Sequence, residues 1–248
     1  MKILVAIPTY NEKDNIGPIL DSVSSLNSSE SVKNSNNTIN LLIIDDNSPD
    51  GTGRIVKEFQ KKYDNGSLFL IEREKKLGLG TAYIGAFNFA LEKGYDYVLT
   101  MDCDFSHNPE EIVNFIKLMD SEKCGMIVGS RYSGGIRVIN WSMKRLLISY
   151  FANIYAKFIT GIDISDLTGG FNMYDVNCLK KINLRGISSR GYAFQIEMKF
   201  RVAMEAECGF KELPIIFYER TKGKSKMSKN IIFEAFFGVI KLRLGFYK

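Results

Sequence analysis

The sequence predicts an α/β fold, in which one mainly parallel sheet is covered by helices on both faces. Between residues 2 and 130, five short apolar runs alternate with segments whose apolar residues recur at helical spacing, as is typical of parallel sheets. Polar or glycine-rich turns follow several of these runs, as expected where strands give way to helices. The 248 residues suffice for one domain with a large core, and we find neither an internal repeat nor an interdomain linker.

The first half of the chain supplies the strands of the expected sheet. Apolar, β-prone runs predict strands at Lys2–Pro8, Leu41–Ile44, Leu68–Ile71, Tyr97–Met101 and Gly125–Ser130. Helices are expected between successive strands, because apolar residues recur there every three or four positions. The segment Ser24–Asn40 is rich in serine and asparagine, which predicts a surface loop.

The second half of the chain has a different character. Trp141–Ile159 predicts a long helix with a broad apolar stripe, and Phe194–Glu207 predicts another helix. A strand is expected at Glu212–Tyr218, and the basic segment Arg220–Lys226 follows it. The last helix is expected over Asn230–Tyr247, where aromatic residues stand next to basic ones.

The stretch Tyr95–Asp104 organises the expected site. Its apolar run ends in Asp102 and Asp104, and Asn108 and Pro109 then predict the start of a helix. Ligands of open α/β sheets bind beyond the carboxyl ends of the strands, where two carboxylates are suitable ligands for Mg²⁺ or Mn²⁺. A metal-held nucleotide diphosphate is therefore the first hypothesis. The alternative is a plain strand-to-helix turn with one capping and one solvated aspartate.

Acidic or glycine-rich turns also follow two other expected strands. Asp45 and Asp46 come after Ile44, and a Gly-Leu-Gly turn at Gly78–Gly80 comes after the third strand. Because the carboxyl ends of parallel strands lie at one edge, these turns are expected to converge with the Asp-x-Asp triplet, which favours the metal-nucleotide hypothesis. The two aspartates are candidates for a second metal pair, for reading a nucleobase or for helix capping. The glycine turn lacks the third glycine of a dinucleotide fingerprint, so we interpret it as a tight turn.

Other polar residues carry both a functional and a structural interpretation. Arg131 directly follows a strand, where it either clamps a phosphate or pairs with Asp102. His107 is interpreted as a turn residue, with a metal ligand or a base as alternatives, and Glu197 as part of an exposed helix face, with a pocket role as the alternative. The basic segment is either a solvated face or a mobile arm that closes over a diphosphate.

Composition limits the function classes. The net charge of +5, without zinc-finger spacings or basic repeats, does not mark a nucleic-acid binder. Uncharged apolar runs are too short to span a bilayer, and no signal peptide is visible. The four scattered cysteines, without C-x-x-C pairs, predict reduced and mostly buried thiols in a cytosolic setting.

Taken together, these stretches resemble a known family, the dolichyl-phosphate mannose synthases, which are inverting family-two glycosyltransferases. The ordered set of motifs that carries the resemblance runs from the first strand to about Lys226 and consists of Ile7–Glu12, Ile44–Thr52, Leu77–Ala82, Met101–His107, Gly129–Tyr132, Asp166–Phe171 and Lys224–Lys226. The resemblance implies a type A glycosyltransferase fold, a divalent cation, and transfer of mannose from GDP-mannose to dolichyl phosphate for glycosylation and GPI-anchor pathways. It also implies a catalytic domain at residues 1–228 and an amphipathic, membrane-interfacial helix at residues 229–248.

The resemblance assigns roles by position. Asp104 would be the principal metal ligand together with Asp102, and Asp102, Asp104 and Arg131 form the expected catalytic set. The expected nucleotide-sugar-binding residues are Pro8, Tyr10, Glu12, Ile44, Asp46, Asp102, Cys103, Arg131, Arg220 and Lys226. Family members often have alanine in place of Cys103, and some have a metal-binding glutamine in place of Ser106, so water is expected to complete the metal shell here. A thiol beside the acids also raises the hypothesis of a thiol-sensitive enzyme.

A dolichyl substrate implies work at a membrane surface. We hypothesise that the two apolar helices of the second half form an interfacial surface, while the alternative is that both stripes pack in the core. A small transmembrane partner subunit is another route to anchoring. The expected location is the cytosolic face of the endoplasmic reticulum membrane, or the cytoplasmic membrane face in a bacterium.

Several alternatives stay open at this point. One is a close relative, either a UDP-glucose-dependent dolichyl-phosphate glucosyltransferase or a bacterial polyprenyl-phosphate enzyme. A nucleotidyltransferase would need a glycine-rich, arginine-containing loop after the first strand, which Pro8–Glu12 does not provide. A non-catalytic subunit that binds nucleotide sugar is the alternative from another class.

Overall fold

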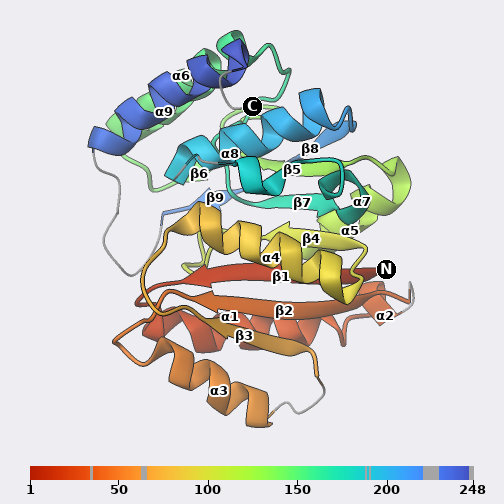
Figure 1. Cartoon of the computed structure of the whole chain (residues 1–248). Helices are drawn as coiled ribbons and strands as arrows, with labels where there is room; N and C mark the ends of the chain where they lie inside the picture. Colours follow the sequence, from red (N-terminus) through yellow and green to blue (C-terminus); the bar gives the residue numbers. More distant parts are fainter. Residues whose placement is uncertain (34–35, 63–65, 188, 190, 220–228, 246–248) are drawn as a thin grey trace.

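A computed structural model describes residues 1–33, 36–62, 66–187, 189, 191–219 and 229–245 of the chain. It confirms the predicted fold class, a single α/β domain with a mainly parallel sheet between layers of helices (Figure 1). The seven strands of the main sheet lie in the order β3-β2-β1-β4-β7-β5-β8, and only β7 runs antiparallel to its neighbours. A short parallel pair, β6 and β9, stands apart from this sheet.

The strands predicted in the first half of the chain agree with the structure to within a few residues, but the one strand predicted at Glu212–Tyr218 is wrong, since the chain there forms two strands in different sheets. The bounds of the strands are β1 Lys2–Thr9, β2 Thr38–Asp45, β3 Leu68–Glu72, β4 Tyr97–Thr100, β5 Met126–Ser130, β6 Val138–Ile139, β7 Asn172–Asp175, β8 Phe210–Pro214 and β9 Phe217–Tyr218. The α-helices are α1 Lys13–Leu26, α2 Glu30–Lys33, α3 Thr52–Lys62, α4 Leu79–Lys93, α5 Glu111–Glu122, α6 Met143–Thr160, α7 Val176–Leu179, α8 Gly191–Phe200 and α9 Lys229–Leu244.

Both faces of the sheet are covered by helices, and the side chains of each strand alternate between the two buried faces. On β1, Ile3 and Val5 point to a core layer formed with α1 and α5, while Leu4 and Ala6 point to a layer formed with α4 and α8. A strand buried on both faces reads as a continuous apolar run, which explains why the sequence shows β1 so clearly. The second layer also contains Val239 of α9, so the last helix packs on the same core.

Some predicted boundaries were wrong. The expected loop Ser24–Asn40 is shorter, because α1 continues to Leu26 and β2 begins at Thr38, with Ile39 buried in the core. The helix expected to begin at Asn108 and Pro109 begins at Glu111 instead, since Asn108 turns back and its Oδ1 accepts the Glu110 N–H at 3.1 Å. The helix expected at Phe194–Glu207 changes after Phe200 into a π-helical turn at Arg201–Glu205.

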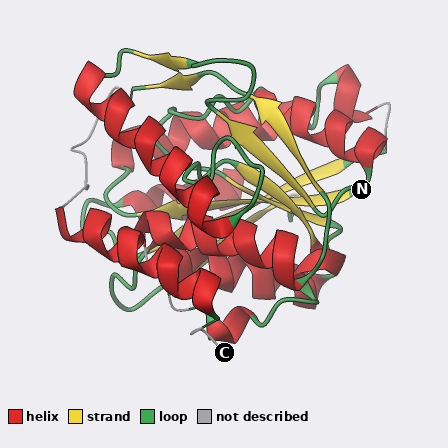
Figure 2. Ribbon diagram, turned by 90° about the horizontal axis from the view of Figure 1, so that it is seen from above, coloured by secondary structure: helices red, strands yellow, loops and turns green. Residues whose placement is uncertain are grey.

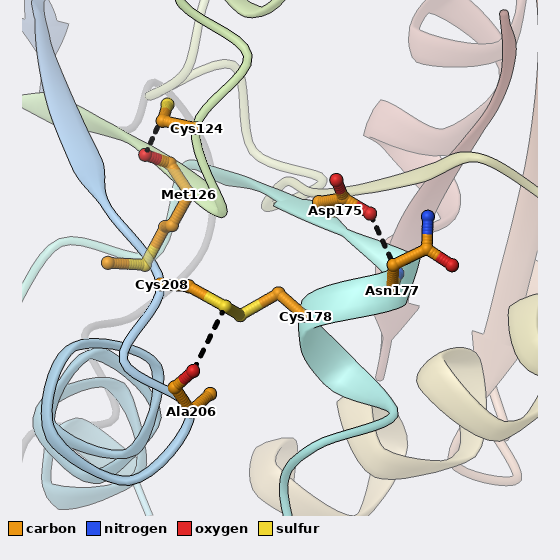
Figure 3. Close-up of a disulfide and its surroundings, with 7 residues drawn as sticks. All are labelled: Cys124, Met126, Asp175, Asn177, Cys178, Ala206 and Cys208. Atoms are coloured by element: carbon orange, nitrogen blue, oxygen red, sulfur yellow. Dashed lines mark hydrogen bonds between the residues drawn. A yellow bond between two sulfur atoms is a disulfide. The ribbon is translucent and has the colours of Figure 1, made fainter.

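The prediction of reduced cysteines was wrong for one pair. Cys178 on α7 and Cys208 before β8 form a disulfide, with a Cα–Cα distance of 6.3 Å that suits such a bond (Figure 3). The two residues are 30 positions apart and lack a spacing signature, so only the packing of α7 against the β8 end brings them together. Cys103 and Cys124 are buried free thiols, as predicted.

Helices α6 and α9 lie side by side on the outside of the molecule (Figures 1 and 2). The Tyr155 hydroxyl of α6 donates to the Phe236 carbonyl oxygen of α9 at 3.0 Å, and the two rings stack at 4.5 Å. Along α6 only Asn153, Ala156 and Thr160 are buried. Most of the apolar stripe of α6 therefore faces away from the core. Within the part of the chain that the structure describes, no helix is long and apolar enough to cross a bilayer.

Candidate active site

The predicted site residues of the described chain come together at one edge of the sheet. Pro8 closes β1, Asp46 follows β2, Asp102 and Asp104 follow β4, and Arg131 follows β5. Strands β1, β2 and β4 are parallel, so their carboxyl ends share the edge that lies opposite the N-terminus in Figure 1. The prediction that these turns converge is thereby confirmed for this part of the chain.

The Asp102–His107 turn holds the acidic pair in place by hydrogen bonds of its own. The Asp102 backbone N–H donates to His107 Nδ1 at 3.1 Å. Asp104 Oδ1 accepts from the Ser106 backbone N–H at 3.1 Å and from the Ser106 hydroxyl at 2.5 Å. Burial lowers the pKa of His107 to about 4, against the opposing effect of Asp104, so the imidazole is neutral and its Nδ1 is a hydrogen-bond acceptor. His107 is therefore a buried residue that holds the turn through its Nδ1 atom.

Cys103 lies between the two acids and faces inward. Its side chain is buried, and burial together with the charges of Glu12, Asp104 and Asp102 raises its pKa well above the ordinary value. A thiol that keeps its proton is a poor nucleophile, and the thiol sensitivity of the site stays a prediction for an alkylation assay. Burial and the nearby Asp102 carboxylate likewise raise the pKa of Tyr83, whose hydroxyl keeps its proton beneath the acidic turn.

The two adjacent aspartates after β2 have different surroundings. Asp45 is buried and accepts from the Thr9 hydroxyl at 2.8 Å and from the Ser48 backbone N–H at 2.8 Å, so it binds the β1 and β2 ends together. Asp46 forms an ion pair with Arg73, which also donates to the Thr81 hydroxyl at 2.7 Å. Asp45 is thus a structural residue, whereas Asp46 is connected through Arg73 to Thr81 at the start of α4.

The turn after β1 is attached to the turn after β2. The Glu12 backbone N–H donates to the Thr52 hydroxyl at 3.0 Å, and the Lys13 backbone N–H donates to Asp50 at 3.0 Å. The ring of Tyr10 lies 4.2 Å from the Lys76 ammonium, a cation–π contact. Residues from three strand ends therefore form one polar rim beside the acidic pair.

Three non-glycine residues of these turns have left-handed backbones. Asn11 follows β1 with a φ of 58°, Asn47 follows β2 with 57°, and Phe105 follows β4 with 57°. Asparagine tolerates this region, whereas for phenylalanine it is costly. Such conformations cluster where surrounding contacts impose them, frequently at functional sites.

Arg131 is a buried cation of the site, with 6% of its surface exposed. Its guanidinium binds both carboxylate oxygens of Asp166, at 2.6 and 2.7 Å, and the Thr168 hydroxyl at 2.8 Å. Burial would raise the pKa of Asp166, but the charge and hydrogen bonds of Arg131 lower it. The rings of Trp141 and Phe217 lie 5.4 and 5.5 Å from the guanidinium carbon. The sequence left Asp102 open as a partner of Arg131, and the structure gives Asp166 that role.

Strand β9 joins the acidic turn to the Arg131 region. The Tyr218 backbone N–H donates to the Ser106 carbonyl oxygen at 3.2 Å, and the Phe217 N–H donates to the Arg137 carbonyl oxygen at 2.9 Å. The Phe217 ring contacts His107 at 5.4 Å. This short strand thus contacts both halves of the site.

Sequence reasoning missed two residues of the site. The sequence assigned no role to Asp166, although it lies in one of the motifs that carry the resemblance, and no role to Lys199. Both side chains are fully buried. Glu197 is not on an exposed face as interpreted: it is buried and pairs with Arg201 at 2.7 Å. The side chains of α8 from Ala193 to Phe200 are all buried. In the sequence, however, the polar residues among them look like the solvent-exposed face of an ordinary amphipathic helix.

Two further predicted residues have special positions. Ile44 is buried in β2, where it pairs in register with Pro8, so its side chain belongs to the core beneath the polar rim. Arg220 and Lys226 lie outside the described residues, as does the rest of the basic segment.

The fit of a divalent cation depends on Asp102 and Asp104. Among the described residues no group of three or more potential ligands of the His, Cys, Asp or Glu type occurs. Two carboxylates suffice for Mg²⁺ or Mn²⁺ when substrate phosphates and water complete the shell, since these ions take oxygen ligands. Both are carboxylates on one turn, with Asp104 7% exposed and held through Oδ1 by Ser106, so the chemistry of this donor set fits such a cation.

Comparison with known proteins agrees with this geometry. The family described as "Glycosyl transferase family 2" matches residues 4–182. A polyprenol monophosphomannose synthase of Mycolicibacterium smegmatis is 38% identical over 96% of this chain and 85% of its own length. An undecaprenyl-phosphate mannosyltransferase of Micrococcus luteus is 35% identical over 99% of this chain and 95% of its own length.

Solved structures share the fold at lower identity. Glucosyl-3-phosphoglycerate synthase from Mycobacterium tuberculosis, in complex with Mn²⁺, UDP-glucose and phosphoglyceric acid, superposes with a TM-score of 0.66, at 14% identity over 98% of this chain and 80% of that one. The mannosyltransferase PcManGT from Pyrobaculum calidifontis, in complex with GDP-Man and Mn²⁺, gives 0.57, at 14% identity over 97% of this chain and 69% of that one. The chain has the type A glycosyltransferase fold and belongs to glycosyltransferase family 2.

Proposed function

We propose that this enzyme transfers mannose from GDP-mannose to a polyprenyl phosphate, with inversion at the anomeric carbon. The observation that carries the proposal is the similarity over nearly the whole chain to two curated relatives, one named a polyprenol monophosphomannose synthase and the other an undecaprenyl-phosphate mannosyltransferase. The arrangement of acids and arginines at the edge of the sheet supports it, because the reaction brings two phosphate groups together.

The residues suit a reaction that needs no strong protein base. The second pKa of a phosphate monoester is about 6, so the acceptor is largely a nucleophilic oxyanion at neutral pH. Its oxygen forms the new bond to the anomeric carbon while the bond to GDP breaks, and the electron pair leaves with the diphosphate. His107 is buried and holds the turn through Nδ1, which fits a positioning role better than that of a base. The protein must chiefly hold two anions together.

We assign the donor site to the polar rim and the acidic pair. Asp102 and Asp104 would hold Mg²⁺ or Mn²⁺, which supplies Lewis-acid stabilisation of the diphosphate when bound. In this proposal Pro8, Tyr10 and Glu12 would surround the nucleoside, Asp46 would read the base, and the Cys103 backbone would lie near the nucleotide. The assignments of Ile44, Arg220 and Lys226 rest on the sequence resemblance alone.

We assign the acceptor phosphate to the cations near Trp141. The Arg145 guanidinium lies 4.0 Å and the Arg131 guanidinium 5.4 Å from a Trp141 ring centre, and Arg145 also forms an ion pair with Glu219. Arg145 belongs to the first turn of α6, and the exposed apolar residues of α6 begin beside it. A phosphate attached to a long lipid needs cations for its charge and an apolar surface for its chain, and this region offers both.

We propose that α6 and α9 rest on the membrane surface. The most exposed apolar side chains of α6 are Met143, Phe151 and Phe158, at 67%, 61% and 83%. On α9, Phe236 and Phe237 are 44% and 59% exposed. An exposed apolar face flanked by basic residues is typical of interfacial helices. In this view residues 1–228 are the catalytic part and residues 229–248 the interfacial helix, and an anchoring subunit is not required.

The lipid acceptor is the point on which the sequence resemblance and the curated relatives differ. The sequence resemblance favours dolichyl phosphate at the cytosolic face of the endoplasmic reticulum, for glycosylation and GPI-anchor pathways. Both curated relatives are bacterial, and their names favour polyprenol or undecaprenyl carriers. Parallel assays with dolichyl and undecaprenyl phosphate distinguish these acceptors.

The test is a transfer assay with radiolabelled GDP-mannose and a polyprenyl phosphate in detergent. We expect a mannosylated lipid product when Mg²⁺ or Mn²⁺ is present. We expect no product when a chelator removes the cation, because the charge of the departing diphosphate would then lack its stabilisation. UDP-glucose is tested in the same assay as the comparison donor. Transfer of glucose but not mannose would establish the glucosyltransferase alternative. Binding of GDP-mannose without any transfer to either lipid would favour a non-catalytic subunit.

Vesicle binding tests the membrane surface. We expect the Phe151→Ser/Phe158→Ser variant to bind anionic phospholipid vesicles at least about a hundredfold more weakly, because each of the two phenylalanines contributes about 1.5–3 kcal/mol on burial. Co-sedimentation measures the bound fraction.

The control for vesicle binding is Met204→Ser, an exposed apolar residue of the π-helical turn outside α6 and α9. This variant is expected to bind as the wild type does. Unchanged binding by a folded Phe151→Ser/Phe158→Ser protein would contradict the α6 surface, and unchanged binding by Phe236→Ser/Phe237→Ser would contradict the α9 part.

A further inference from the structure

Lys199 is a buried lysine whose side chain reaches a backbone turn instead of a carboxylate. It lies on α8 with 0% exposure, and its Nζ donates to the carbonyl oxygens of Leu167 at 3.2 Å and Gly169 at 2.6 Å. A buried ammonium group is costly unless hydrogen bonds and opposite charges compensate for it. An apolar side chain of similar length would fill the same space without that cost, so the contacts of the amine call for an explanation.

The turn that Lys199 holds is the one that carries Asp166. The Gly169 N–H donates to Asp166 Oδ1 at 2.9 Å, while the Gly169 carbonyl oxygen accepts from Lys199 on the other side. A side chain at position 169 would meet the Asp166 carboxylate at 3.1 Å, so the glycine backbone is closely packed against it. The same carboxylate binds the Arg131 guanidinium at 2.6 and 2.7 Å. Lys199 is therefore linked to Arg131 through one glycine and one aspartate.

We propose that Lys199 is a positioning residue, which fixes the Asp166–Gly170 turn and through Asp166 the Arg131 guanidinium in the orientation that binds a substrate phosphate. The inference rests on the phosphate-binding role proposed for Arg131. It goes beyond that role, because Lys199 reaches no substrate itself and acts through the turn.

The charge of Lys199 adds an electrostatic component. Burial lowers the pKa of Lys199 to about 7; Asp166 and Glu212 oppose this shift and Arg131 adds to it. A phosphate bound at Arg131 favours the protonated amine, because the anion stabilises a nearby positive charge. By linkage, the protonated amine favours the anion, so phosphate affinity in the wild type falls as the pH rises through about 7. Removal of the amine removes this component.

The test compares Lys199→Met with the wild type by calorimetric binding of farnesyl phosphate and GDP and by transfer kinetics. Methionine has a similar length and no charge, and the desolvation cost of the buried amine that it removes offsets the two lost hydrogen bonds, so the melting temperature is expected to change little. We expect the Kd for farnesyl phosphate and the KM for the polyprenyl phosphate to rise about tenfold, with kcat changed less than about threefold. The dependence of Kd on pH around neutrality is expected to be weaker than in the wild type.

Lys93→Met is the matched control, since Lys93 is exposed at the C-terminal end of α4. The proposal is overturned if the wild type binds and transfers while Lys199→Met keeps Kd and KM within about twofold and the same pH dependence. If Lys199→Met loses stability, Lys199→Gln, which keeps a donor to the two carbonyl oxygens, must restore the Kd above about pH 7, where the wild-type amine is neutral, and failure to do so also overturns it. A wild type that binds neither farnesyl phosphate nor GDP overturns the proposed function first, and the Lys199 inference with it.

Discussion

Replacement of Asp104 with asparagine is expected to reduce sugar transfer by at least about a thousandfold, because several kcal/mol of charge stabilisation depend on its carboxylate. The change keeps the size of the side chain. The Ser106 N–H and hydroxyl, which donate to Asp104 Oδ1, can donate equally to the amide oxygen. The fold is therefore expected to persist, and the loss is expected in the binding of the cation. Transfer assays and a Mn²⁺ titration measure the two effects separately.

Asp120→Asn is the matched control for that experiment, since Asp120 is exposed on α5. It is expected to have wild-type activity. An Asp104→Asn enzyme that keeps more than about a tenth of the wild-type rate would contradict the role of the carboxylate. A lowered melting temperature in the absence of Mn²⁺ would instead indicate that Asp104 is needed for the fold of the turn.

Replacement of Asp166 with asparagine is expected to cause the largest loss of stability, about 3–5 kcal/mol, because it leaves Arg131 buried without its counter-charge. Asp166 is fully buried, and its carboxylate also accepts the Gly169 N–H. Urea denaturation measures the change in the free energy of unfolding. The Thr168→Val control removes one neutral partner of Arg131 and is expected to cost only about 1 kcal/mol.

The same pair predicts a pH dependence. Burial of Asp166 would raise its pKa, but Arg131 lowers it below the ordinary value of 3.8 in the folded protein. A carboxyl group with a lowered folded pKa stabilises the protein fully above its unfolded pKa, and this stabilisation is lost as the pH falls through the folded pKa. The wild type should therefore lose stability on acidification below about pH 4, and Asp166→Asn should lack this component. Equal acid sensitivity of the two proteins would contradict the assignment.

The sequence was most informative where burial is simple. Strands such as β1 are buried on both faces and appear as continuous apolar runs, and the acids stand directly at the ends of such runs. The position of β7 between β4 and β5 was not predicted, because it depends on pairing between distant segments. The disulfide escaped prediction for the same reason.

The buried charges were the main omission at the site. Asp166, Glu197 and Lys199 look like ordinary polar residues of a loop and a helix, yet all three are buried. Helix α8 lies between the sheet and the α6–α9 pair (Figure 1), and its side chains from Ala193 to Phe200 are all buried. A helix enclosed in this way can contain polar residues only when partners exist, and those partners come from remote parts of the chain.

Strand β9 gives the protein a built-in optical reporter. Trp141 is the one tryptophan of the chain, and its ring lies 5.3 Å from that of Phe217, which in turn contacts His107 of the acidic turn. Any rearrangement of that turn reaches the indole through a single intervening side chain. Intrinsic fluorescence can therefore follow events at the acidic pair in the unmodified enzyme, without a label and without turnover.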